Sequence, residues 1–278
     1  MPTFSHSSLS TFESCPLHYS FRYVQKITPP DDRETIELFA GKRVHETLAE
    51  LHLSIMKGKE VELSNLSEYY KTIWQKNFHN GVYSVKDSPE FSIDSYFNSG
   101  IKWIADYYHS NKPFDNETSL KIEWKINIPL GVHNQYKLVG VIDRLSKLPD
   151  GTLLINDYKT SRNLPTDYQI DLDRQLSLYQ LGVQKEFDSS SNVKLVWHYL
   201  AFNKKITIIR PKSKLDEIER STIKLALAVQ DATEQNSFPA KKGPLCNYCE
   251  YKPICPEWKV ADNSKKQYKR TIQTKLNF

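Results

Sequence analysis

Two aspartates and a lysine on neighbouring apolar segments are the residues of this sequence best suited to chemistry. Residues 138–145 and 152–160 have the composition of strands, and the Pro-Asp-Gly between them is typical of a turn. Asp143 lies in the first strand, and Asp157 and Lys159 lie in the second. Because side chains alternate across a strand, Asp157 and Lys159 point to the same face. The sequence therefore predicts a hairpin that holds two carboxylates and an ammonium group.

These three groups could together cleave a phosphodiester bond. Carboxylates at the end of apolar strands must be paired, hydrated or bound to a cation, and Mg²⁺ or Mn²⁺ prefers oxygen ligands. Such an ion can deliver a bound water as a hydroxide-like nucleophile, while an ammonium group orients that water and stabilises the added negative charge. Taken alone, an Asp-x-Lys pattern more often marks a surface ion pair, so the interpretation needs support from elsewhere.

Two predicted helices supply that support. His45 lies beside the apolar stripe of a helix expected over residues 34–57. A histidine in such a place is more often a satisfied core or surface residue than a ligand. Gln175 and Tyr179 are four residues apart in a helix that begins near residue 173, so they share one face. An ordinary helix surface is the alternative explanation for this pair.

Taken together and in this order, these residues resemble the RecB-type branch of the PD-(D/E)XK nuclease superfamily. The resemblance extends from residues 7–16 to the cysteine-rich segment near the C-terminus, and it implies an α/β fold with a central mixed sheet flanked by helices. It implies that the catalytic residues are His45, Asp143, Asp157 and Lys159. His45, the two aspartates and the backbone carbonyl of Tyr158 would bind Mg²⁺ or Mn²⁺, and Lys159 would assist the base.

The same resemblance implies roles for three further residues. Gln175 and Tyr179 would position the scissile strand, and Glu123, in a strand-like segment near residue 120, is a weaker candidate for the same site. The acidic residue before the lysine is Asp157, where the family more often has glutamate, and this is a permitted variant.

Four cysteines form a second pattern. Cys246, Cys249 and Cys255 are closely spaced, and Cys15 stands far upstream. A spacing of two residues between thiols suits a shared metal centre. Disulfides are the weaker alternative because the chain carries no export signal, and zinc is the stronger competitor. Cys-Pro at both ends resembles AddB-type nuclease domains and CRISPR-associated adaptation nucleases, which implies a structural 4Fe-4S cluster that joins the N- and C-terminal segments.

The chain of 278 residues is long enough to bury a substantial core. We expect one nuclease domain over residues 1–258, with a largely helical part at 35–112, a sheet core at 118–235 and cluster-binding segments at Cys15 and 244–256. Within it we expect helices at 65–78, 92–109 and 215–231 and strands at 193–202 and 205–210. Aromatic residues at helical spacing in the first two helices are expected to be core. No apolar run could span a membrane, and we expect a soluble, cytoplasmic protein.

The net charge of +5 comes entirely from the C-terminal segment. Residues 259–278 carry six basic residues and one acidic residue, while the preceding chain carries 32 of each sign. DNA affinity must therefore come from a local groove and from this basic tail. Gln273, Leu276 and Phe278 resemble the Q-x-x-L-x-F peptide of proteins that bind a sliding clamp, so a clamp is a possible partner.

The sequence contains no phosphate-binding G-x-x-x-x-G-K-[ST] loop, so any unwinding must come from a separate helicase. The expected function is a metal-dependent deoxyribonuclease, a single-strand DNA exonuclease that processes ends in recombination, repair or CRISPR adaptation. The alternative is a non-catalytic DNA-end-binding or clamp-tethered adaptor with a vestigial nuclease site. The intact Asp143, Asp157 and Lys159 argue against this alternative.

Overall fold

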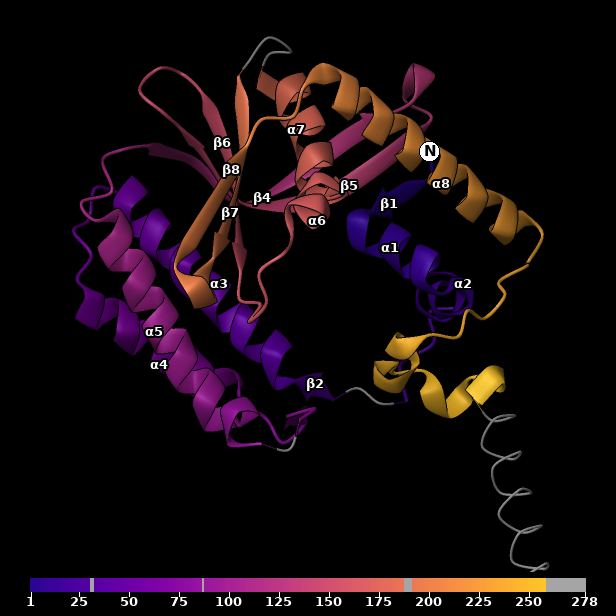
Figure 1. Ribbon diagram of the computed structural model, residues 1–278, viewed down its shortest axis with the longest axis horizontal. Helices are drawn as coiled ribbons and strands as arrows, with labels where there is room; N and C mark the ends of the chain where they lie inside the picture. The colour runs from indigo at the N-terminus through magenta and orange to yellow at the C-terminus, as the bar shows by residue number, and fades with distance from the viewer. Residues whose placement is uncertain (31–32, 87, 188–191, 259–278) are drawn as a thin grey trace, which may run out of the picture. The chain divides into compact units, whose positions relative to one another are not determined.

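The fold is known from a computed structural model that describes residues 1–30, 33–86, 88–187 and 192–258 (Figure 1). The chain forms two compact units. The first, here the sheet unit, contains Met1–His6 and Arg33–Ile223. The second, here the cysteine unit, contains Ser7–Asp32 and Lys224–Phe278. The basic segment 259–278, with its clamp-like Gln273, Leu276 and Phe278, lies outside the described residues.

A mixed sheet organises the sheet unit. Among the described residues its strands are β1 Thr3–Ser5, β4 Thr118–Leu130, β5 Tyr136–Lys147, β6 Leu153–Lys159, β7 Val193–Tyr199 and β8 Lys204–Ile208. Their order is β1-β5-β6-β7-β8, and β4 pairs with the other edge of β5. The pairs β1–β5 and β6–β7 are parallel, while the pairs that join β5 to β4 and β6, and β7 to β8, are antiparallel. The α/β fold with a mixed central sheet is therefore confirmed.

The predicted hairpin is present, but its two strands separate before they end. β5 pairs with β6 only from Arg144–Asn156 to Lys147–Leu153. Beyond that point β6 continues beside β7 alone, while β1 pairs with β5 only at residues 137–139. Residues 140–143 of β5 therefore have no strand partner on this edge within the described chain. We call this separation the fork.

Helices flank the sheet. Those of the sheet unit are α3 Ile36–Met56, α4 Leu63–Asn77, α5 Ile93–Asn111, α6 Asp167–Asp171 and α7 Arg174–Phe187, and α8 Lys212–Glu234 runs past the boundary between the units. The short strands β2 Glu34–Thr35 and β3 Val82–Tyr83 pair with each other. Short 3₁₀ helices are Pro89–Phe91, Val132–Asn134 and Leu200–Phe202. Helix α7 packs against β4, β6 and β7, whereas α3 packs against β4, β5 and the helices α4 and α5.

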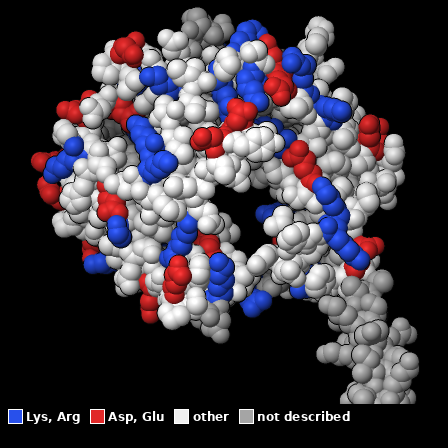
Figure 2. Space-filling model, viewed as in Figure 1, with Lys and Arg blue, Asp and Glu red and all other residues white. Residues whose placement is uncertain are grey.

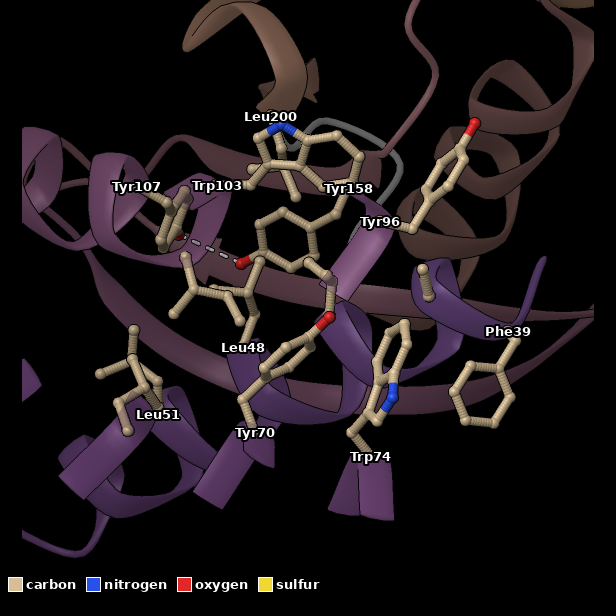
Figure 3. Close-up of a cluster of buried hydrophobic side chains, with 14 of the residues drawn as sticks. Phe39, Leu48, Leu51, Tyr70, Trp74, Tyr96, Trp103, Tyr107, Tyr158 and Leu200 are labelled. Atoms are coloured by element: carbon tan, nitrogen blue, oxygen red, sulfur yellow. Dashed lines mark hydrogen bonds between the residues drawn. The ribbon is translucent and has the colours of Figure 1, made fainter. Parts of the chain in front are cut away.

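The core of the three-helix layer is largely aromatic (Figure 3). Val44, Leu48 and Leu51 of α3 are fully buried, as the helical period of the sequence predicts. Around them lie the aromatic side chains of α4 and α5, which include Tyr70 and Trp103. The aromatic residues in these two helices are thus mainly core, although Tyr69 is 36% exposed. These long helices were predictable because an amphipathic pattern persists over many turns.

A buried polar network joins this core to the sheet. Arg144 is 1% exposed, and its Nη2 donates to Glu117 Oε1 at 2.7 Å. Its Nε donates to the Tyr158 hydroxyl at 3.1 Å, and that hydroxyl lies 3.1 Å from the hydroxyl of Tyr107 (Figure 3). Burial opposes ionisation of Glu117, but the charge of Arg144 together with the hydrogen bonds from Ser146 and Arg144 lowers the pKa of Glu117. The network is therefore an ion pair whose remaining hydrogen-bonding groups are met by tyrosine and serine hydroxyls.

The cysteine unit is built from both ends of the chain. Its helical segments are α1 His6–Ser14, α2 Pro16–Tyr19, a π-helical turn at Ser20–Val24 and 3₁₀ helices at Pro244–Tyr248 and Lys252–Ile254. Tyr251 is 1% exposed, and its hydroxyl donates to the carbonyl of Ile27 at 2.9 Å. The ring of Tyr251 also contacts those of His18 and Phe21. The N- and C-terminal segments are therefore packed on each other within this unit.

Helices formed by the described residues include none with the length and apolar character needed to cross a membrane.

A buried histidine, His198, lies against Tyr107 and Tyr158 of the network and predicts acid sensitivity. Burial and the charge of Arg144 hold the pKa of His198 well below its usual value near 6.5. His198 Nε2 lies 2.8 Å from Asn156 Oδ1. Below about pH 6.5 His198 binds a proton in the unfolded chain but not in the folded chain. The contribution of neutral His198 to the stability of the fold is therefore present above that pH and is lost as the pH falls.

We expect the free energy of unfolding of His198→Gln to fall less steeply than that of the wild type below pH 6.5, by about 1.4 kcal/mol per pH unit. Urea denaturation between pH 5 and pH 7.5 measures both slopes. The exposed His109→Gln is the matched control and should keep the wild-type slope. Equal slopes for His198→Gln and the wild type would contradict the prediction.

Candidate active site

The fork brings residues of three elements together. The Tyr158 N–H donates to Asp143 Oδ2 at 2.8 Å, so a carboxylate takes the place of the missing strand partner. His45 Nε2 on α3 donates to the carbonyl oxygen of Tyr158 at 2.8 Å. His45 Nδ1 lies 3.5 Å from Asp143 Oδ2. One histidine therefore contacts both strands at the point where they separate.

Asp157 is a buried carboxylate with an incomplete set of partners. It is 7% exposed, and its Oδ2 makes no hydrogen bond within the described chain. Lys159 Nζ forms an ion pair with this oxygen at 2.8 Å. Burial raises the pKa of Asp157 to about 6, although the charge of Lys159 acts in the opposite direction. The two side chains lie on the same face, as the strand alternation predicts.

Glu123 of β4 also lies at this place. One donor atom each from Glu123, His45 and Asp143 falls within 4.8 Å of the others. Glu123 has a φ of +46°, an uncommon conformation for a residue with a side chain and one that stores strain. Burial raises the pKa of Glu123, and the charge of Asp143 adds to this effect. The strained backbone at Glu123 thus holds its carboxylate beside that of Asp143.

The donor set fits a divalent cation. Asp143, Asp157 and Glu123 offer carboxylate oxygens, Tyr158 offers a carbonyl oxygen and His45 offers an imidazole nitrogen, which are the donors that Mg²⁺ and Mn²⁺ accept. Burial opposes protonation of His45, but the hydrogen bond and charge of Asp143, with further charges from Asp157 and Glu123, raise the pKa of His45 to about 8. A cation would offset the same negative charge.

Helix α7 meets the fork through Tyr179. Gln175 Nε2 donates to the Tyr179 hydroxyl at 3.2 Å, so the pair shares one face as expected. The Tyr179 ring lies directly against Gly140, where a Cβ atom would come within 2.7 Å of the hydroxyl oxygen. Only glycine leaves room for the ring at this point of β5. The structure thus brings Tyr179 to the fork and Gln175 to Tyr179.

Sequence reasoning missed the residues behind the site. The Tyr158 side chain is held by the Arg144 network described above, so the residue whose carbonyl faces His45 is anchored in the core. Of these residues only Arg144 left a signal, because it is a charged residue inside an apolar strand. The contribution of Tyr107 and Glu117, from distant segments, left none.

The four cysteines lie in the cysteine unit, and all are half-buried free thiols. Cys15 Sγ accepts from the N–H of Lys241 at 3.5 Å, and Cys246 Sγ accepts from the N–H of Gly243 at 3.4 Å. Burial raises the pKa of Cys249, and the neighbouring charges of Cys15 and Cys255 add to the rise. Cys15 and three closely spaced cysteines far from it in sequence thus carry thiols in one compact unit.

A histidine and a glutamate accompany these thiols. His18 Nε2 lies 3.1 Å from Glu250 Oε1, and donor atoms of His18, Cys249 and Glu250 fall within 4.8 Å of one another. Arg22 also contacts Glu250, at 3.3 Å. His18 thus offers an additional donor that the spacing of the cysteines did not suggest.

Surface charge gives no broad basic face in the view of Figure 2, where Lys and Arg are interspersed with Asp and Glu. This agrees with the equal numbers of basic and acidic residues before residue 259.

A family model described as the PD-(D/E)XK nuclease superfamily matches residues 3–256 of this chain. Among solved structures, the chain is similar to a proposed exonuclease from Eubacterium rectale, with 13% identity, a TM-score of 0.48, and coverage of 87% of this chain and 86% of that one. It is also similar to the protein SSO0001, with 16% identity, a TM-score of 0.39, and coverage of 92% and 87%. No curated protein matches the chain.

The contact between Tyr179 and Gly140 can be tested by substitution. Gly140→Ala should force the Tyr179 ring away from β5 and lower the free energy of unfolding by about 1–3 kcal/mol, as overpacking does. Gly243→Ala is the matched control, because a Cβ atom at Gly243 would meet no other atom within 4 Å and the backbone there is extended. The double variant Gly140→Ala/Tyr179→Leu should recover part of the loss. Urea denaturation measures the free energy of unfolding of all three variants. A Gly140→Ala variant as stable as the wild type would contradict the close packing of Tyr179 on Gly140.

Proposed function

The chain belongs to the PD-(D/E)XK nuclease superfamily, and from that premise we propose that it is a metal-dependent deoxyribonuclease. The observation that carries the proposal is the fork, where His45 contacts Asp143 and the Tyr158 carbonyl, with Glu123 beside them, and where Asp157 pairs with Lys159 on β6. Three carboxylates lie at or near this point, and Lys159 is the basic partner of only one of them, so a bound cation would offset the negative charge that remains. Within this class we propose a single-strand DNA exonuclease that processes ends in recombination, repair or CRISPR adaptation.

His45, Asp143, Asp157 and the carbonyl of Tyr158 would hold the cation. Mg²⁺ or Mn²⁺, when bound there, supplies charge neutralisation and lowers the pKa of a water molecule. Glu123 lies close enough to join these ligands or to orient what binds beside them. Tyr158 is fixed from behind by Arg144 and Tyr107, so its carbonyl oxygen keeps one position.

Lys159 provides positive charge at the reacting phosphate. Burial opposes ionisation of Lys159, but the charge and hydrogen bond of Asp157, with further charges from Asp173 and Asp143, raise the pKa of Lys159, so the ammonium group stays protonated at neutral pH. A fixed ammonium group orients a water molecule and stabilises the charge that develops in the transition state. Gln175 and Tyr179, which contact each other and β5, would position the scissile strand.

Cleavage of labelled single-stranded DNA with Mg²⁺ or Mn²⁺ tests this proposal. Asp157→Asn and Lys159→Ala should each lower kcat by roughly 10³-fold, because each removes a charge at the reacting phosphate. Asp150→Asn is the control, since Asp150 is an exposed aspartate in the turn of the same hairpin. EDTA should abolish cleavage by the wild type.

Circular single-stranded DNA distinguishes an exonuclease from a nuclease that cleaves within the strand. An exonuclease leaves circles intact and shortens linear strands that carry a label at either end. Equal activity of Asp157→Asn and the wild type, or no activity in either, would sink the nuclease proposal and favour a DNA-end-binding adaptor. We propose that any helicase or sliding clamp that acts with this protein is a separate partner. The clamp would bind through Gln273, Leu276 and Phe278.

For the cysteine unit we propose a 4Fe-4S cluster held by Cys15, Cys246, Cys249 and Cys255, with zinc as the competing occupant. The support is the set of free, half-buried thiols and the closeness of Cys249 to Cys15 and Cys255. Thiolates are the ligands that such clusters use. A metal centre between distant segments restricts the unfolded chain, so the cluster would be structural. Free thiols also fit a reducing, cytoplasmic location.

Iron and sulfide content after anaerobic purification tests the cluster. We expect a coloured protein that contains iron, and we expect Cys249→Ser to lose iron and to unfold at a lower temperature. Ser14→Ala, an exposed change next to Cys15, should leave both properties unchanged. A colourless protein with full zinc occupancy would show that the cysteines bind zinc and not a 4Fe-4S cluster.

A further inference from the structure

One face of α3 lines a groove of about 620 Å³ that runs past the candidate active site. Leu38 and Leu53 lie toward its two ends on α3, and His45 lies between them. At the helical rise of about 1.5 Å per residue, these leucines are about 22 Å apart along the axis. Glu123 of β4 and Tyr69 of α4 also line the groove. The groove therefore extends along α3 on both sides of His45.

The end of the groove toward Leu53 carries two carboxylates and an aromatic ring. Glu46 Oε1 accepts from Arg43 Nη2 at 2.5 Å, and Glu50 Oε1 accepts from Ser54 Oγ at 3.0 Å. The second oxygen of each carboxylate makes no hydrogen bond within the described residues, so both carboxylates can accept another. Tyr69 is 36% exposed, unlike most aromatic residues of this layer.

These three side chains line the same groove. Burial raises the pKa of Tyr69, and the charges of Glu50 and Glu46 raise it further, while the charge of Arg43 lowers it. The tyrosine ring and the two carboxylates thus form one surface, which we call the acidic end of the groove.

The charge of the groove determines which part of a nucleotide it can accept. Four glutamates line it, of which Glu46 is paired with Arg43, and Lys42 is the basic residue among its lining side chains. A phosphate placed among carboxylates without a cation would be repelled. The phosphate must therefore stay at His45 and the proposed cation, and the uncharged base is the part that can enter the acidic end.

The chemistry of the acidic end distinguishes between bases. A tyrosine ring offers a stacking surface that every base can use. A carboxylate accepts a hydrogen bond from the amino group of cytosine or adenine, whereas thymine presents a carbonyl oxygen at the corresponding position. Two oxygens facing each other repel, so thymine is disfavoured.

We propose that Tyr69, Glu46 and Glu50 form a base-binding subsite for the nucleotide next to the scissile phosphate, with a preference for cytosine or adenine over thymine. The inference rests on the proposed nuclease function, and it adds a sequence preference that the catalytic groups alone do not confer. Tyr69 supplies stacking, and the carboxylates supply the discrimination.

Cleavage of two matched hexanucleotides tests the subsite, one of deoxycytidine and one of thymidine. The wild type should cleave the cytidine strand with a kcat/KM about tenfold higher, the effect of one well-placed contact to a base. Glu50→Gln should remove the preference, because an amide can also donate to the thymine oxygen. Tyr69→Ala should raise KM for both strands and keep the preference.

Glu68→Gln is the matched control, because Glu68 precedes Tyr69 on α4, is exposed and does not line the groove. It should behave as the wild type. Binding of the same labelled strands in Ca²⁺, followed by fluorescence anisotropy, gives a readout that does not require cleavage.

The outcomes separate the subsite from the nuclease activity. Equal kcat/KM for the two strands would overturn the subsite and leave the nuclease standing. If neither strand is cleaved, tighter binding of the cytidine strand that Glu50→Gln abolishes would support the subsite while the proposed nuclease function fails. Absence of cleavage with equal binding, or with no binding, would overturn both.

Discussion

The separation of β5 from β6 is the constraint on which the candidate site depends. A continuous ladder would pair the backbone of Tyr158 with β5 and leave its polar groups satisfied. Because pairing stops at Arg144 and Asn156, the N–H of Tyr158 bonds to the Asp143 carboxylate and its carbonyl faces His45. Unpaired backbone groups in a buried place need such partners. The fork thus turns an ordinary hairpin into a set of donors directed at one point.

Rigidity at the fork comes from the opposite side of the same strand. The Tyr158 hydroxyl is held by Arg144 and Tyr107, and Arg144 is held by Glu117. A buried ion pair adds little stability after the cost of removing both charges from water, but it fixes geometry when every hydrogen-bonding group has a partner. The aromatic core of α3, α4 and α5 encloses this network. Core packing and site geometry are therefore parts of one arrangement.

Much of the fold was predictable because its patterns are local and long. The helices α3, α4 and α5 and the strands β5 and β6 lie within a few residues of their expected positions. The short strand β1 and the five-residue helix α6 were not predicted, because a segment of so few residues shows no detectable hydrophobic period. Glu123 was a weak candidate for a different reason. Its approach to His45 depends on a φ of +46°, which no sequence pattern predicts.

The sequence by itself determined which groups could do chemistry and that Asp157 and Lys159 share a face, because side-chain alternation is a property of a single strand. It also showed that the charge before residue 259 is balanced, so that no general attraction to DNA follows from composition. Only the tertiary structure decided that His45 reaches Tyr158 across 113 residues of chain and that Tyr69 lies beside Glu46 and Glu50. Such distances depend on how helices pack on a sheet, and packing is set by the whole core rather than by any segment.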